Sequence, residues 1–160
     1  MDKDTLKKAN FILDILEEIE TLLSKYYDLC ALIFPEDSQL WKTISLDEIN
    51  HSQFVAQMRE ALMERPDLFE LGHIKLPVLK TFRQELYNQF IRLKKGEILR
   101  KNAFFIARDL ENSMMEHQFY KVLEGGDAKF KDLKDRIIQE TENHFQKIDS
   151  YIKKTYLEPD

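Results

Sequence analysis

The sequence predicts an all-α fold of four long helices, with one extra helix inside the longest connection. Two observations support this class. Apolar residues recur at spacings of three and four along most of the chain, which is the period of a helix with one buried face. The 160 residues include only four glycines and four prolines, so long stretches of the chain contain no helix breaker.

Composition points to one compact domain over residues 1–160. Hydrophobic residues make up 43 % of the chain, which is sufficient for a single core. The chain has no apolar run long enough to span a membrane, and its start, "MDKDTLKKANF", lacks the apolar region of a signal peptide. We therefore expect a cytoplasmic protein.

Charge and cysteine content exclude several kinds of partner and site. A net charge of −5 without a basic stripe argues against nucleic acid or an anionic membrane as a partner. The single cysteine, Cys30, excludes an internal disulfide and a four-cysteine iron site within this chain. A metal bound here would need oxygen and nitrogen ligands.

Prolines and glycines divide the helices. Pro35 separates a first helix at about 6–33 from a second at about 37–64. The stretch "EGGD" at 124–127 divides the last two long helices. The connection at roughly 66–97 is far longer than a hairpin loop, whereas the other two are only a few residues long. Two short links and one long crossover form the connectivity of a ferritin-like bundle.

The long crossover carries its own helical pattern. Pro77 can begin a helix that runs to "KKG" at 94–96. Its apolar stripe is larger than a connector needs and contains Leu79, Phe82, Leu86, Phe90 and Leu93. We expect this stripe to cover one end of the bundle or to pair with a second copy of the chain, and a homodimer is the preferred state.

Carboxylates and imidazoles interrupt the apolar faces of the long helices. The second helix places Glu48 and His51 in the middle of its stripe, and the last helix repeats the arrangement. The first and third helices each add one acid. The residues predicted to point inward are Glu20, Glu48, His51, Glu111, Glu140 and His144.

These six residues form a hidden repeat. Glu48 follows Glu20 by 28 positions, with His51 three residues further on. Glu140 follows Glu111 by 29 positions, with His144 four residues further on. Each half of the chain is thus a helical hairpin that supplies one lone Glu and then a Glu/His pair.

Burial of this set requires compensation. An unpartnered buried carboxylate costs several kcal/mol, and four of them would also repel one another. Two divalent cations would neutralise the four charges, and each cation would take one imidazole. Four Glu and two His form the ligand set of a carboxylate-bridged dinuclear centre. Iron or manganese suits these ligands, and zinc is a possible substitute.

The sequence also resembles a known family. The stretches "EIETLLSKYYDL", "WKTISLDEINHSQF", "AFFIARDLENSMMEHQFYKVLEGG" and "FKDLKDRIIQETENHFQKI" are similar to the rubrerythrin-like branch of the ferritin-like superfamily. The resemblance covers about residues 8–152. It implies that the six residues bind two iron ions and that Tyr27 lies where the family commonly has an aromatic. We expect Tyr27 to be either a donor to a ligand carboxylate or a core aromatic.

The resemblance implies a function, with two departures from the family pattern. Related proteins react with peroxide or dioxygen, or oxidise and bind ferrous iron; without a rubredoxin-like domain, electrons would come from a separate protein. Thr141 occupies the expected ligand position three residues before His144, and Met114 stands where rubrerythrins carry a further acid. The alternative hypothesis is a ferritin-like scaffold whose site is degenerate or structural and which acts through protein partners.

Overall fold

The computed structural model describes residues 1–157, and over that range it confirms the all-α class. Five α-helices and one small sheet make up most of the described chain. The helices are α1 (Lys3–Ile33), α2 (Ser38–Glu64), α3 (Leu76–Lys94), α4 (Arg100–Glu116) and α5 (Ala128–Ile152), and the strands are β1 (Phe69–Leu71) and β2 (Leu123–Gly125). Single helical turns cover Pro35–Asp37, Pro66–Leu68, Phe119–Val122 and Lys153–Leu157.

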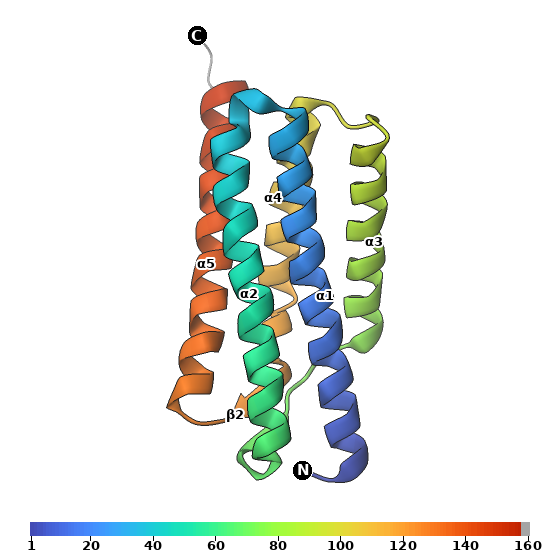
Figure 1. Ribbon diagram of the computed structural model, residues 1–160, viewed down its shortest axis with the longest axis vertical. Coiled ribbons are helices and arrows are strands. Elements are labelled where there is room, and N and C mark those ends of the chain that lie inside the picture. Colours follow the sequence, from blue (N-terminus) through green and yellow to red (C-terminus); the bar gives the residue numbers. More distant parts are fainter. Residues whose placement is uncertain (158–160) are drawn as a thin grey trace.

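Helices α1, α2, α4 and α5 lie side by side around a common core (Figure 1). Helices α2 and α4 run in the same direction, because the segment that contains α3 carries the chain back to the end at which α2 began (Figure 1). The extra helix predicted within the long crossover is therefore present. The fold brings the inner faces of two hairpins, α1–α2 and α4–α5, against each other.

One aromatic side chain from each of these four helices contributes to a continuous stack in the core. The Trp41 ring centroid lies 5.7 Å from that of Tyr27 and 4.4 Å from that of Phe104. Phe104 in turn stacks on Tyr151, with centroids 4.5 Å apart. Large aromatic side chains bury much apolar area in few rotamers, so this stack fixes how the four helices sit against one another.

Helix α3 lies along the outside of α1 (Figure 1). Its buried residues are Leu79, Phe82, Leu86 and Leu93, and Phe90 is half-buried. The stripe that the sequence analysis assigned to one end of the bundle or to a second copy thus packs within the chain, on the flank of α1.

The segment after α4 differs from the prediction. The third long helix was predicted to reach "EGGD" at 124–127, but α4 ends at Glu116 because Gln118 adopts a left-handed conformation with φ 50°. The chain then forms β2, which pairs antiparallel with β1 in the register Phe69↔Gly125. Gly125 has φ +89°, and a Cβ there would lie 2.3 Å from the carbonyl oxygen of Leu68. The pairing therefore requires glycine at this position.

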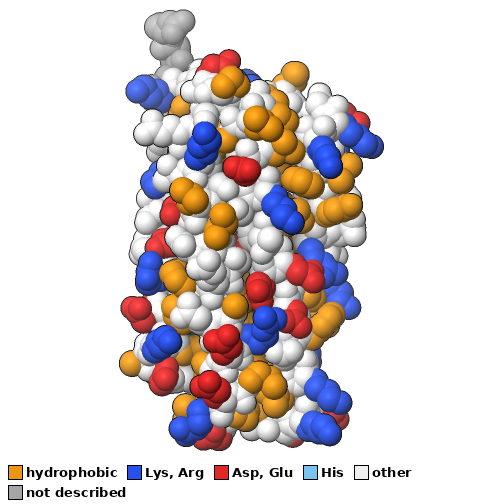
Figure 2. Space-filling model, viewed as in Figure 1, with side chains coloured by type: hydrophobic (Ala, Val, Ile, Leu, Met, Phe, Trp, Pro, Cys, Tyr) orange, Lys and Arg blue, Asp and Glu red, His pale blue; other side chains and the backbone are white. Residues whose placement is uncertain are grey.

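Two further features describe the exterior. Within the described residues, none of the helices combines the length and apolar character needed to cross a bilayer. On the face seen in Figure 2, acidic and basic side chains are intermingled and apolar side chains are scattered between them.

Candidate metal centre

Two groups of buried Glu and His side chains lie in the core. One contains Glu20 of α1 with Glu48 and His51 of α2, and the other contains Glu48 with Glu111 of α4 and His144 of α5. In each group the ligand-type atoms all lie within 4.8 Å of one another. All five side chains are at most 1 % exposed. Each group can hold a metal ion, and Glu48 belongs to both.

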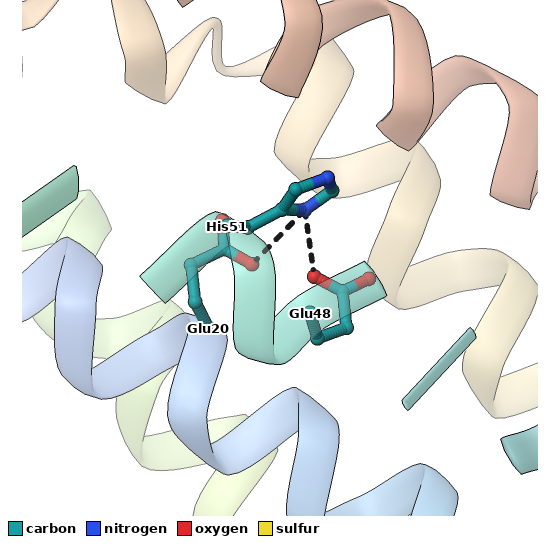
Figure 3. Close-up of side chains that lie close together, drawn as sticks. All are labelled: Glu20, Glu48 and His51. Atoms are coloured by element: carbon teal, nitrogen blue, oxygen red, sulfur yellow. Dashed lines mark hydrogen bonds and ion pairs between the residues drawn. The ribbon is translucent and has the colours of Figure 1, made fainter. Parts of the chain in front are cut away.

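The first group depends on helical spacing within α2 and on the packing of α1. Glu48 and His51 are three residues apart and share one helix face, and Glu20 approaches that face from α1 (Figure 3). His51 Nδ1 lies 3.0 Å from Glu48 Oε2 and 3.7 Å from Glu20 Oε2 (Figure 3). The imidazole therefore turns its Nδ1 atom toward both carboxylates.

The second group has nearly the same geometry around the other oxygen of Glu48. His144 Nδ1 lies 2.9 Å from Glu48 Oε1 and 3.8 Å from Glu111 Oε1. The rings of His51 and His144 are stacked, with centroids 5.6 Å apart. One carboxylate oxygen of Glu48 thus faces each imidazole.

The outward nitrogen of each imidazole contacts an acid on the opposite helix. His51 Nε2 lies 2.8 Å from Glu140 Oε2, and His144 Nε2 lies 3.0 Å from Asp47 Oδ2. Each acid stands four residues before the histidine of its own helix. Both are partly exposed, with 30 % of the Glu140 side chain and 34 % of the Asp47 side chain accessible.

The structure brings together five of the six residues singled out in the sequence. Glu140 lies outside both groups, on the far side of His51. Asp47 was missed by the sequence analysis, although its spacing to His51 equals that of Glu140 to His144. That equality was the available signal. A carboxylate that holds the outward N–H of an imidazole fixes the tautomer and the ring orientation for a metal at the other nitrogen.

Tyr27 and Thr141 complete the surroundings of the site. The buried Tyr27 hydroxyl donates a hydrogen bond of 2.5 Å to Glu111 Oε1, so of its two possible roles the structure shows the donor to a carboxylate. Thr141, 4 % exposed, stands three residues before His144, as Glu48 stands before His51. The α5 counterpart of Glu48 therefore has no carboxylate.

Several ligand-type atoms of the site have no hydrogen-bond partner among the described residues. They are both carboxylate oxygens of Glu20, Oε1 of Glu48 and Nδ1 of His144; the last two lie close together without hydrogen-bond alignment. Buried polar groups are normally paired, because an unpaired one loses its hydration without replacement. Oxygen-rich donors with two imidazoles would be satisfied by iron, manganese or zinc.

Burial and the charges of neighbouring groups shift the pKa of each acid and each histidine in the two groups. Burial, together with the charge of Glu48, raises the pKa of Glu20 well above its usual range and that of Glu111 to about 8. Burial also acts to raise the pKa of Glu48, but its contacts with both histidines hold that pKa below its ordinary value.

The pKa values of both histidines are raised, which favours the protonated, charged imidazole. Burial alone would lower the pKa of each histidine, yet contacts with Glu20 and Glu48 raise the pKa of His51 to about 12. Contacts with Glu48 and Glu111 raise the pKa of His144 to about 9. Without metal, protons on the imidazoles and on two acids therefore supply the positive charge that cations would otherwise provide.

The chain matches no protein-family model, no curated protein and no solved structure. Its identification therefore rests on the fold and on the residues of the site. What the fold and the site define is an all-α protein with two buried Glu/His groups suited to metal ions and joined through Glu48.

Proposed function

We propose that this protein is a dinuclear metal protein of the rubrerythrin-like, ferritin-like type, with two iron ions as its cofactor. The observation that carries the proposal is that Glu48 belongs to both buried groups. A single carboxylate with one oxygen toward each imidazole is what a bridged pair of metals requires, and a single structural ion would need only one of the two groups.

Each residue has a definite role in this proposal. Glu20 and His51 would bind one metal, Glu111 and His144 the other, and Glu48 would bridge them. Asp47 and Glu140 hold the outward nitrogens of the imidazoles, and Tyr27 orients Glu111. When bound, an iron pair supplies one-electron redox chemistry and Lewis acidity. The proposed activity is oxidation by peroxide or dioxygen, or oxidation and handling of ferrous iron, with electrons from a separate protein.

A second candidate function is favoured by the asymmetry of the site. Thr141 provides no carboxylate, and in the metal-free state imidazolium–carboxylate pairs such as His51 with Glu48 can compensate the buried charge. In that case the chain is a scaffold with a degenerate site that acts through protein partners.

Metal analysis after anaerobic loading with ferrous iron separates the two functions. We expect two irons per chain, one for each group, after unbound metal is removed by gel filtration. The double variant Glu48→Ala plus His51→Ala should lose both. Fewer than about one iron per chain in the unaltered protein, or no loss in the double variant, would contradict the dinuclear proposal.

The chain offers a matched control for this experiment. Glu70 and His73 have the same spacing as Glu48 and His51 but are exposed. Glu70→Ala plus His73→Ala removes the same two residue types and should leave the iron content unchanged. Peroxide and dioxygen consumption by the loaded protein would then identify the oxidant.

A further inference from the structure

A cavity of about 220 Å³ lies between α4 and α5 beside the metal centre. Its lining includes Met114, one turn after Glu111, and Thr141, one turn before His144. The cavity therefore adjoins the second Glu/His group from the side of α4 and α5. Its volume is more than ten times the roughly 10–15 Å³ that one water molecule needs, yet it is below the range typical of drug-sized ligands.

The wall that the cavity shares with the site lacks a carboxylate. Thr141 occupies the α5 position that corresponds to Glu48 on α2. Thr141 also lines the cavity. Two metals bridged by Glu48 would thus have no protein carboxylate opposite it. The coordination positions left open there would lie on the side of Thr141, which also lines the cavity.

Charge balance at the metals favours an anion in this space. The two groups contain three carboxylates, Glu20, Glu48 and Glu111, whereas two divalent cations carry four positive charges. One positive charge remains among these fully buried groups, and such a charge is costly in a dry core. The two further acids, Asp47 and Glu140, are about one-third exposed, so solvent screens their charges. A monoanion would cancel it.

The rest of the cavity shows which kind of anion fits. Met114, Met115 and Ile138 provide an apolar wall. The other polar lining residues, Gln118, Lys121 and Glu142, are exposed and carry one positive and one negative charge between them. Tyr120 lines the same cavity and is 3 % exposed, and its buried hydroxyl has no hydrogen-bond partner among the described residues. The combination of an apolar wall, an unused hydroxyl donor and an open metal face matches a short aliphatic chain with an acidic head.

We propose that this cavity binds a small aliphatic monocarboxylate, whose carboxylate takes the metal positions left open at Thr141 and whose chain packs on Met114, Met115 and Ile138. This inference rests on the proposed function, because the metals supply the charge that the carboxylate neutralises. It adds the class of molecule that the centre receives.

Cobalt(II) is the probe for the test, because its visible absorption reports ligands that enter the coordination sphere. The cobalt-loaded protein is titrated with hexanoate, with acetate and with the neutral hexan-1-ol. We expect hexanoate to change the cobalt spectrum and to bind at least about tenfold more tightly than acetate, since its additional methylenes are buried. Hexan-1-ol should leave the spectrum unchanged.

Three variants locate the effect. Thr141→Glu gives the site its own second carboxylate, so it should retain two cobalt ions and lose the hexanoate response. Met115→Trp fills the cavity and should lose the preference of hexanoate over acetate, whereas Met63→Trp, at an exposed methionine of α2, should retain it. Tyr120→Phe should weaken hexanoate binding by roughly fivefold to tenfold.

The outcomes separate this inference from the proposed function. If two cobalt ions bind but hexanoate produces no spectral change, or binds Met115→Trp as it binds the unaltered protein, the cavity site is wrong and the metal centre stands. If cobalt does not bind at all, the dinuclear centre fails and the carboxylate site fails with it. Should Thr141→Glu not fold, the Met115→Trp and Met63→Trp pair decides the matter.

Discussion

The two hairpins, α1–α2 and α4–α5, supply the candidate metal centre with matching residues in matching order, and they differ at one position. Each contributes a lone Glu, an outer acid four residues before its histidine, and the histidine itself. The matching pairs are Glu20 with Glu111, Asp47 with Glu140, and His51 with His144. Three residues before the histidine, however, the first hairpin has Glu48 and the second has Thr141.

This difference shows how one carboxylate can serve both groups. Glu48 directs one oxygen toward each imidazole, so both groups depend on this one residue of α2. The lone acids also differ. Glu111 accepts a hydrogen bond from Tyr27, whereas both oxygens of Glu20 lack a partner among the described residues. The α1–α2 half is therefore the less satisfied half without metal.

The largest effect is expected from Glu48→Gln, which keeps the shape and removes the shared charge. Both metals should be lost, and the metal-free protein should lose about 3–5 kcal/mol of unfolding free energy, because two buried imidazoles lose their anionic partner. Thr141→Val, at the matching position, should retain both metals and cost about 1 kcal/mol. Urea unfolding and metal analysis measure both quantities. Equal effects at the two positions would contradict the asymmetry.

The sequence predicts much of this arrangement because helical periodicity is local. Glu48, His51 and Glu111 fall inside apolar stripes that recur every three or four residues. Their convergence follows from hairpins that turn their apolar faces to one core. Periodicity also predicts α3, although it does not indicate which surface α3 covers.

The remaining features depend on tertiary packing. Glu140 and Thr141 are neighbours on α5, about 100° apart around the helix axis, and only the packing of α5 on α2 and α4 decides which of them faces the core. The structure turns Thr141 inward and places Glu140 against His51. Likewise, α4 ends at Glu116 through the conformation of Gln118, at a place where "EHQFY" contains no glycine or proline.

The second expected effect is a dependence of stability on pH, whose range differs between the two halves. The pKa of His144 is raised from 6.5 to about 9, and that of Glu111 from 4.5 to about 8. Between pH 6.5 and 9 the folded state therefore holds more protons than the unfolded state, and its stability falls as pH rises. The metal-free protein should lose roughly 5–10 °C in melting temperature over this range.

His51, the matching residue of the α1–α2 half, differs from His144 in the pH range over which it affects stability. The pKa of His51 is raised to about 12, so the folded state keeps an extra proton on His51, and stability continues to fall, from pH 6.5 to well above pH 9. Calorimetry should show that His144→Gln flattens the pH profile only below about pH 9, whereas His51→Gln flattens it both below and above pH 9. Equal flattening by both substitutions above pH 9 would contradict this difference between the halves. Metal affinity should rise with pH, because bound metal displaces these protons.

A smaller effect is expected from the outer acids, and here the two halves should behave alike. Asp47→Asn and Glu140→Gln each replace the charged acceptor at the outward nitrogen of the opposite imidazole with a neutral amide, so each should weaken metal binding by roughly 10–100-fold while two metals still bind at saturation. Chelator competition measures this affinity. Asp132→Asn, an exposed acid of α5, is the control and should have no effect.

The same pair of variants tests the ligand role that the sequence predicts for Glu140. If Glu140 binds a metal directly, Glu140→Gln should lose one metal at saturation and Asp47→Asn should not. Retention of both metals in both variants would instead assign Glu140 to positioning His51. The stoichiometry distinguishes the two roles even where the affinities are similar.

The smallest effect is expected at the lone acids, through Tyr27→Phe. This substitution removes the 2.5 Å hydrogen bond to Glu111 and should cost the metal-free protein about 1 kcal/mol, the usual net worth of one buried hydrogen bond. Tyr26→Phe is the matched control, since the neighbouring hydroxyl makes only a 3.4 Å contact with the carbonyl oxygen of Ala103, and its cost should be smaller. Urea unfolding compares the two. Because Glu20 has no equivalent donor, Tyr27→Phe would make the halves more alike, and a cost no larger than that of Tyr26→Phe would show that the hydroxyl does not distinguish them.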